Sequence, residues 1–314
     1  MDEQENRIVI QCNHIVKDYG KNRGNFDLDF SIRQGETLGI VGENGAGKTT
    51  LIRQIMGFIS SDQGNIRIYG YDAYKDSARL KRYIGYIPGE INFPDVKTGF
   101  DFLKDYGRSL GMRESDFAYA DEIISRMQLD ARAYPKRMSK GMKQKTAIVA
   151  SMMLKAPILI MDEPSIGLDP LMREELLSLI LEQKKRGATM LMTSNTIEEL
   201  ERVCDRVAYL SQGKIIDIAD VNLVKNRPYR DLKIGFREDE DYIAFLKGRD
   251  DIIRLKPEYD QVIIRIEKKK LPQLFQQLKD IKLNYVSEEK YDLTTYFDEK
   301  RRMQKVKENS KNGN

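Results

Sequence analysis

Between residues 7 and 70 the chain carries short apolar runs separated by polar or glycine-containing turns, a pattern typical of strands. Residues 26–32 (FDLDFSI) alternate apolar and polar side chains, as a half-exposed antiparallel strand does. Residues 37–41 (TLGIV) form a continuous apolar run of strand length, and residues 48–59 have the composition of a helix. Two further short runs predict strands at residues 8–10 and 65–69.

The middle of the chain predicts a helical segment followed by alternating strands and helices. Residues 98–145 are rich in methionine and lysine, which favour helices. Residues 157–162 (PILIMD) are almost entirely apolar, as strands buried in a parallel sheet are. Strands are also predicted at residues 83–87, 189–193, 206–210 and 214–218, and helices at residues 171–185 and 197–203. We therefore expect an α/β core with an inserted helical subdomain and an antiparallel β flap.

A break at Asn226, Arg227 and Pro228 separates this region from a C-terminal region with another pattern. Strands at residues 232–236, 252–255, 262–266 and 283–286 and helices at residues 241–247 and 271–278 follow the order β-α-β-β-α-β. This order is that of the ferredoxin-like arrangement. We therefore expect a large α/β domain at residues 1–226, a small α+β domain at residues 227–290 and a charged tail at residues 291–314. The tail is helical or disordered; from Lys300 on its polar, lysine-rich sequence most simply indicates disorder, with contact to anionic lipid as a second interpretation.

The segment that follows the predicted strand 37–41 fits G-x-x-x-x-G-K-[ST], the phosphate-binding loop of a P-loop NTPase core. Its glycines let the backbone approach a polyphosphate, and its N–H groups and the following helix N-terminus attract anions. Lys48 is placed to reach the β- and γ-phosphates, and the Thr49 hydroxyl to ligate Mg²⁺. A plain glycine-rich turn is the alternative, which the strand-loop-helix context disfavours. The predicted nucleotide-binding residues here are Gly42, Glu43, Asn44, Gly45, Ala46, Gly47, Lys48, Thr49 and Thr50.

Two acidic residues end the apolar strand at residues 157–162. Asp162 lies at the carboxyl end of that strand, where its carboxylate can hold Mg²⁺, and Glu163 follows at once. Glu163 is placed to polarise a water molecule against the γ-phosphate, so we predict that it is catalytic. A capped strand end with two solvated acids is the alternative interpretation.

Composition and charge limit the other function classes. The net charge is +4, from 53 basic and 49 acidic residues, and this near balance predicts no nucleic-acid groove. Cys12 and Cys204 are too far apart for a metal or redox motif, which suits a reducing cytosol. Residues 1–7 carry no signal pattern. The longest apolar candidate, residues 146–161, contains Lys155 and Pro157 and is shorter than the ~20 residues of a membrane span. If the protein works at a membrane, another chain must supply the spans.

A third element, residues 138–145 (MSKGMKQK), precedes the acidic strand. Here the chain resembles the ATP-binding subunits of ABC transporters, which carry L-S-G-G-Q-x-Q at this place. Ser139, Gly141 and Gln144 match that pattern. Lys140 and Met142 depart from it in the manner common among subunits that serve ABC-2-type exporters. The resemblance implies that Ser139 and Gly141 bind the γ-phosphate of an ATP molecule held by a second subunit.

Two more segments resemble this family. Residues 165–170 (SIGLDP) are similar to the D-loop, which crosses the dimer interface and couples the two sites. Tyr19 resembles the aromatic residue that stacks on adenine. A plain Tyr19-Gly20 turn is the alternative for that residue, because the chain has 16 tyrosines.

The chain departs from the family at two positions near the γ-phosphate. Asn195 stands where the family usually places a histidine, and the only histidine, His14, lies near the first strand, where a structural role is expected. After residues 83–88 the family expects a glutamine that ligates Mg²⁺, whereas this chain has Gly89 and Glu90. Glu90 can serve as a metal ligand if the loop shifts by one residue. Because Asn195 cannot carry a proton or a charge, we expect a functional but slow ATPase with Glu163 and Asn195 in the catalytic site.

The resemblance implies ATP and Mg²⁺ as cofactors and a dimer, homomeric or heteromeric, that powers a membrane permease on a separate chain. Export is favoured, with the protein bound peripherally at the cytoplasmic face of the membrane. Docking of the permease is expected near residues 89–102, where Ile91, Phe93 and Phe100 are candidates for contact or for the core.

Two other functions stay open. A nucleotide-dependent regulatory module that pairs with an active paralogue would explain the altered residues near the γ-phosphate. A soluble relative acting on DNA or ribosomes is the other; the single phosphate loop, the absence of a heptad stretch and the small net charge argue against it.

Overall fold

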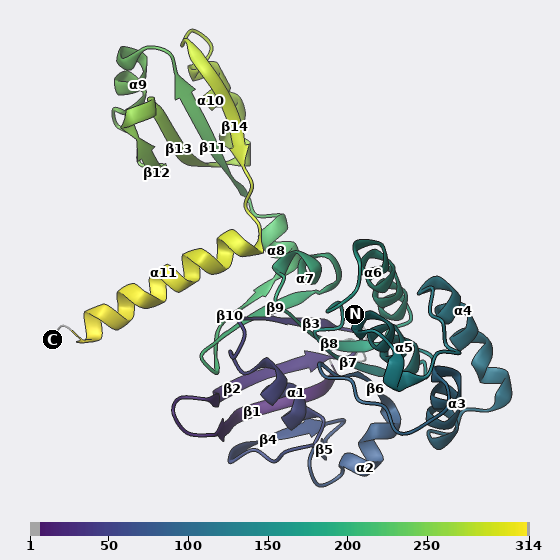
Figure 1. Cartoon of the computed structure of the whole chain (residues 1–314). Coiled ribbons are helices and arrows are strands. Elements are labelled where there is room, and N and C mark those ends of the chain that lie inside the picture. Colours follow the sequence, from purple (N-terminus) through teal and green to yellow (C-terminus); the bar gives the residue numbers. More distant parts are fainter. Residues whose placement is uncertain (1–6, 313–314) are drawn as a thin grey trace. The chain divides into compact units, whose positions relative to one another are not determined.

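The computed structural model describes residues 7–312 and divides into two units after Val221. Residues 1–6, for which the sequence predicts no signal, and residues 313–314 lie outside the described part. The first unit contains a six-stranded sheet in the order β10-β9-β3-β8-β7-β6 (Figure 1). Its strands are β3 (Thr37–Val41), β6 (Ile84–Ile87), β7 (Ile158–Asp162), β8 (Thr189–Ser194), β9 (Arg206–Ser211) and β10 (Lys214–Asp220).

This sheet is parallel except at one edge, where β10 runs antiparallel to β9. Every residue of β3, β7 and β8 is buried, as expected for strands covered on both faces. The helices of this core are α1 (Lys48–Ile55), α6 (Pro170–Lys185) and α7 (Ile197–Val203). Helix α1 ends earlier than the predicted residue 59, because Gly57 adopts a left-handed φ of 66° that terminates it.

A second, antiparallel sheet of the first unit has the order β2-β1-β4-β5. Its strands are β1 (Ile8–Asp18), β2 (Gly24–Arg33), β4 (Gln63–Ile68) and β5 (Tyr71–Asp72), and the short helix α2 (Ser77–Leu80) follows. Strand β2 buries alternate side chains such as Leu28, Phe30 and Ile32, which confirms its predicted half-exposed character. These side chains belong to one core cluster with Leu51 and Ile52 of α1, so the flap is fixed against the helix that follows the phosphate loop.

The helical subdomain lies between β6 and β7 in the chain. It consists of α3 (Gly99–Ser109), α4 (Ala118–Arg126) and α5 (Lys140–Met152), with short 3-10 turns between them. Thr98 caps α3 by accepting a hydrogen bond from the Asp101 nitrogen at 3.0 Å. The predicted α/β P-loop core, antiparallel flap and inserted helical subdomain are therefore confirmed.

Arg126 joins the helical subdomain to the core. Its guanidinium donates to Glu175 at 2.6 Å and to Glu182 at 2.7 Å, and both carboxylates belong to α6. We expect Arg126→Ala to lower the free energy of unfolding by about 1–3 kcal/mol, because two partly buried carboxylates lose their cation. Urea denaturation measures this loss. Arg113→Ala is the matched control, since the Arg113 side chain is 85% exposed; equal destabilisation by the two variants would contradict the role of Arg126.

The second unit has the predicted β-α-β-β-α-β order. Its elements are β11 (Tyr229–Phe236), α9 (Asp239–Leu246), β12 (Ile252–Lys256), β13 (Gln261–Glu267), α10 (Leu271–Gln277) and β14 (Leu283–Glu289), preceded by α8 (Val221–Lys225). The sheet is antiparallel, in the order β12-β13-β11-β14. Leu232, Ile234 and Phe236 of β11 lie in its core with apolar residues of β13 and α10. The ferredoxin-like arrangement is confirmed.

Helix α11 (Leu293–Asn312) corrects the expectation of a disordered end from Lys300 on. Asp292 starts the helix by accepting a hydrogen bond from the Thr295 nitrogen at 3.0 Å. Arg265 of β13 donates to Glu299 at 2.8 Å and anchors the first turns to the sheet. Residues 300–312 contain no glycine or proline and are rich in good helix formers, so the helix continues.

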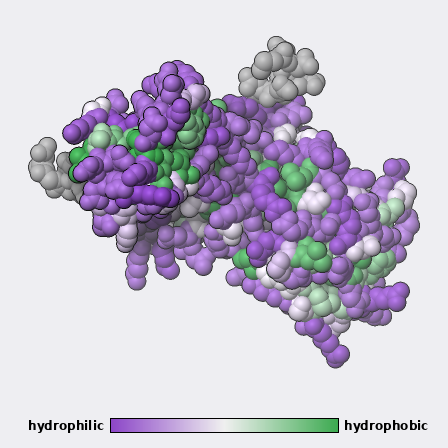
Figure 2. Space-filling view, turned by 90° about the horizontal axis from the view of Figure 1, so that it is seen from above, coloured by the Kyte–Doolittle hydropathy of each residue, from purple (hydrophilic) through white to green (hydrophobic). Residues whose placement is uncertain are grey.

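The outer surface agrees with the polar composition. Of the helices within residues 7–312, none combines the length and the apolar composition that a membrane crossing requires. The face drawn in Figure 2 is covered mainly by hydrophilic side chains, with hydrophobic ones in separate groups.

Candidate functional site

The predicted phosphate loop connects β3 to α1. Gly45 and Gly47 adopt φ values of 82° and 107°, which residues other than glycine rarely adopt. Gly47 is the N-cap of α1, and the first turn of α1 contains no acidic residue, so the positive end of the helix dipole is not neutralised locally. The loop therefore has the backbone shape and the electrostatics of an anion site.

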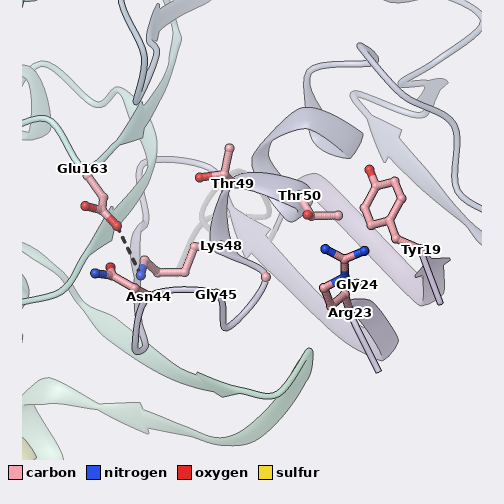
Figure 3. A pocket seen from close by; sticks show the side chains of 10 residues that line it. Tyr19, Arg23, Gly24, Asn44, Gly45, Lys48, Thr49, Thr50 and Glu163 are labelled. Carbon is pink, nitrogen blue, oxygen red and sulfur yellow. Dashed lines mark ion pairs between the residues drawn. The ribbon is translucent and has the colours of Figure 1, made fainter. Parts of the chain in front are cut away.

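Three side chains from three elements meet beside the loop. Lys48 is only 4% exposed, and its Nζ donates to the Gly42 carbonyl oxygen at 2.7 Å and to Asn195 Oδ1 at 2.6 Å. The same Nζ lies 3.2 Å from Glu163 Oε1, the ion pair drawn in Figure 3. Asn195 Nδ2 donates to Glu163 Oε2 at 2.9 Å. Lys48, Glu163 and Asn195 thus form one cluster, which we call the lysine cluster.

Glu163 has a strained backbone. Its φ is 49°, in the left-handed region, which costs about 1–2 kcal/mol for a residue with a side chain. Its nitrogen donates to the carbonyl oxygen of Thr193 at 3.2 Å and to the Thr193 hydroxyl at 3.0 Å. These two bonds to β8 hold the carboxylate in the lysine cluster.

A cavity of about 660 Å³ opens over the loop. Tyr19 lies at one end of it and Glu163 at the other, with the loop between them (Figure 3). The cavity is lined by Tyr19, Arg23, Gly24, Asn44, Gly45, Gly47, Lys48, Thr49, Thr50 and Glu163. Arg23 and Gly24 are absent from the predicted set, because no motif marks them; their closeness to Tyr19 in the sequence is the only signal.

The other predicted site residues do not line this cavity. Gly42, Glu43 and Ala46 belong to the loop but are not among the lining residues, and Asn195 contacts two residues that are, Lys48 and Glu163. Ser139 caps α5, where its side chain accepts a hydrogen bond from the Met142 nitrogen at 3.2 Å and stays exposed. Gly141 lies against the carbonyl oxygen of Gly167. The start of α5 and the predicted D-loop are therefore neighbours within one chain.

Asp162 lies buried beside the loop. Thr193 donates its hydroxyl to Asp162 Oδ1 at 2.7 Å, whereas Oδ2 has no hydrogen-bond partner among the described residues. Burial raises the pKa of the Asp162 carboxyl, opposed by the nearby Thr193 and Thr49 hydroxyls. An unpartnered carboxylate oxygen near the Thr49 hydroxyl is the donor set that a hard cation such as Mg²⁺ prefers.

Glu90, the third predicted metal ligand, is not brought to Asp162. It is exposed and lines a second cavity, of about 390 Å³, together with Lys140, Lys143 and Gln144. Its neighbour Gly89 lies next to Asp162: a Cβ added to Gly89 would be 3.0 Å from Asp162 Oδ2. Thr49 and Asp162 thus lie together, while the Glu90 side chain lines the second cavity.

Comparison with known proteins shows which family this chain resembles. The ABC transporter family model matches residues 26–166. The linearmycin resistance ATP-binding protein LnrL of Bacillus subtilis (strain 168) is 37% identical over 213 residues, covering 67% of this chain and 68% of LnrL. The bacitracin transport ATP-binding protein BcrA of Bacillus licheniformis is 28% identical over 258 residues, covering 81% of this chain and 84% of BcrA.

A solved structure of the ATP-binding subunit of an ABC transporter has the same fold. It superposes with a TM-score of 0.64 at 29% identity and covers 70% of this chain and 92% of its own. The phosphate loop, the capped start of α5 and the acidic end of β7 follow one another along the chain in the order that the resemblance implies. The chain belongs to the ATP-binding proteins of ABC transporters, which bind ATP and hydrolyse it to drive transport.

Proposed function

We propose that this chain is a Mg²⁺-dependent ATPase that dimerises around two ATP molecules and powers an export permease on a separate chain. The observation that carries this proposal is the lysine cluster. It brings a phosphate-binding lysine and a carboxylate together at one end of the cavity. Those are the two groups that phosphoryl transfer to water requires, one for charge and one for the attacking water.

The residues at the two ends of the cavity support one direction for the nucleotide. The γ-phosphate lies near Lys48 and Glu163, and adenine stacks on Tyr19, a residue that is 49% exposed at the other end. In the lysine cluster, Lys48 pairs with Glu163 and Asn195. ATP therefore competes for Lys48, and its binding releases Glu163 to contact water.

Thr49 and Asp162 would hold Mg²⁺, because they offer a hydroxyl and an unpaired carboxylate oxygen. When bound, the ion would neutralise charge on the β- and γ-phosphates. Glu90 joins them only if the loop around Gly89 moves, and it stays a prediction.

Glu163 is the proposed base or water-positioning group, held by Asn195 and by its two backbone bonds to Thr193. Asn195 is neutral at all pH values near 7, so it supplies no charge to the γ-phosphate. The only histidine, His14, pairs with Asp27 at 2.8 Å and does not line the cavity. We therefore propose slow turnover.

The exposed start of α5 supports a site shared between two subunits. Ser139 is exposed and lies outside the cavity of its own chain, as a residue that serves a partner's ATP does. We propose a dimer, formed with a second copy or with a paralogue, and a permease docked near residues 89–102. The names of LnrL and BcrA, given for linearmycin resistance and bacitracin transport, favour export.

The variant Asn195→His tests the position at which this chain has asparagine and the family usually has histidine. We expect about a tenfold faster kcat, because a charged hydrogen bond to the γ-phosphate is about twice as strong as a neutral one. The gain should appear below about pH 6.5, where histidine is charged, and fade above it. A pH series of steady-state ATPase rates measures both effects. An unchanged rate at every pH would show that Asn195 makes no contact that matters for hydrolysis.

The second candidate, a regulatory module that binds ATP without hydrolysing it, is favoured by Asn195 alone. A steady-state assay with Mg²⁺ and with the co-purified permease separates the two. Turnover above that of Glu163→Gln supports the ATPase. Binding and dimerisation without such turnover support the module.

A further inference from the structure

The hairpin between β1 and β2 has an uncommon turn. The Arg23 nitrogen donates to the Gly20 carbonyl oxygen at 3.2 Å, and the two residues between them, Lys21 and Asn22, have φ values of 55° and 56°. Positive φ at both central positions defines a type I′ turn. Lysine is poorly suited to that conformation, so the turn is strained. It persists because the surrounding strands hold it in place.

This turn fixes both Tyr19 and Arg23. The Tyr19 nitrogen donates to the Arg23 carbonyl oxygen at 2.9 Å, which locks the two residues side by side. Directly after them the chain passes so close to β1 that a Cβ on Gly24 would overlap the Lys17 carbonyl oxygen. Both side chains line the nucleotide cavity as a result.

The Arg23 guanidinium has no ion pair or side-chain hydrogen bond to another residue in the described part of the chain. Its neighbour in the hairpin, Lys17, is neutralised by Asp62 at 2.7 Å. Arg23 thus adds an unpaired, permanently charged group to a cavity whose other cation, Lys48, lies at the opposite end. An unpaired guanidinium that lines a cavity is available to bind an anionic group of a ligand.

The place of Arg23 along the cavity indicates which phosphate group of a nucleotide it would contact. Figure 3 shows Thr50 between the Lys48 end and the pair Arg23 and Tyr19. A nucleotide with its γ-phosphate at Lys48 and its base at Tyr19 brings its α-phosphate closest to Arg23, because that phosphate is the nearest to the base. ATP and ADP present the α-phosphate alike.

We propose that Arg23 is a nucleotide-binding residue whose guanidinium contacts the α-phosphate. This inference rests on the proposed function for the direction of the nucleotide. The contact is made equally in the ground state and the transition state, so it lowers KM without raising kcat. It is also retained in ADP, so it strengthens the binding of ADP as much as that of ATP.

Calorimetric titration of the full-length protein with MgATP and with MgADP tests the proposal. We expect Arg23→Ala to weaken both nucleotides by the same factor, about tenfold, since a charged phosphate contact is lost. Arg23→Lys should recover part of the loss, because charge remains but the planar fork does not. Lys21→Ala is the matched control: it removes a cation from the same turn that does not line the cavity, and affinity should stay unchanged.

Steady-state kinetics supplies the second readout. Arg23→Ala should raise KM about tenfold and leave kcat within twofold of the wild type. Unchanged affinity in Arg23→Ala, or a loss for ATP but not for ADP, would overturn the α-phosphate contact while leaving the ATPase proposal intact. A wild-type chain that binds neither nucleotide would overturn both. A wild type that binds but does not hydrolyse overturns only the ATPase proposal.

Discussion

Glu163→Gln is expected to lower the rate of ATP hydrolysis at least a hundredfold while MgATP binding persists. The amide keeps the size of the side chain but cannot take a proton, and general-base catalysis contributes roughly 10²–10⁴ in rate. Binding persists because the variant removes the ion pair between Glu163 and Lys48, whose atoms lie 3.2 Å apart. Lys48 is then freer to contact phosphate, so affinity should equal or exceed that of the wild type.

Single-turnover hydrolysis and nucleotide titration together measure these two effects. Glu198→Gln is the matched control, since it removes an exposed carboxylate that lies outside the cavity. It should hydrolyse ATP at the wild-type rate. If Glu163→Gln kept more than a third of that rate, another group would have to position the water.

We also expect Glu163→Gln to accumulate as a dimer when ATP is present. ATP that is bound but not hydrolysed keeps the proposed shared site occupied, so light scattering should give twice the monomer mass with MgATP and less with MgADP. A mass that does not depend on ATP would argue against a dimer closed by the nucleotide.

Much of the fold follows from local pattern. The apolar runs that became β3, β7 and β8 are buried along their whole length, and such runs predict parallel strands from sequence alone. The phosphate loop is equally local, because its glycines, its lysine and the helix after it are contiguous. The end of α11 was missed because low hydrophobicity indicates disorder, although Glu299 anchors the helix to Arg265.

The lysine cluster depends on strand order, which the sequence pattern does not contain. β8 lies between β3 and β7 in the sheet, so the loops after these three strands meet at one edge. That order brings Asn195 within 2.6 Å of Lys48. Arg23 was missed for a similar reason: its place in the cavity comes from a turn with two positive φ values, which Lys21 does not signal.

Gly47→Ala is expected to abolish nucleotide binding at micromolar concentrations and to destabilise the first unit by about 2–4 kcal/mol. The backbone at Gly47 has a φ of 107°, and an added Cβ would overlap the Asn25 side chain and lie 2.9 Å from the Gly24 carbonyl oxygen. Asn25 is completely buried. In the amide orientation that satisfies its neighbours, it donates to the carbonyl oxygens of Gly24 at 3.0 Å and Gly47 at 3.1 Å. It cannot move without losing those bonds, so the loop must move instead.

Gly45→Ala separates this clash from backbone strain. Gly45 has a similar positive φ, 82°, but a Cβ there would meet nothing within 4 Å. Strain alone costs about 1–2 kcal/mol, so Gly45→Ala should lose stability and affinity to a smaller extent than Gly47→Ala. Thermal unfolding and ATP titration of both variants give the comparison. Equal losses would mean that positive φ alone sets the loop's shape; a much larger loss at Gly47 would mean that the contact with Asn25 of β2 holds the phosphate loop in its binding conformation.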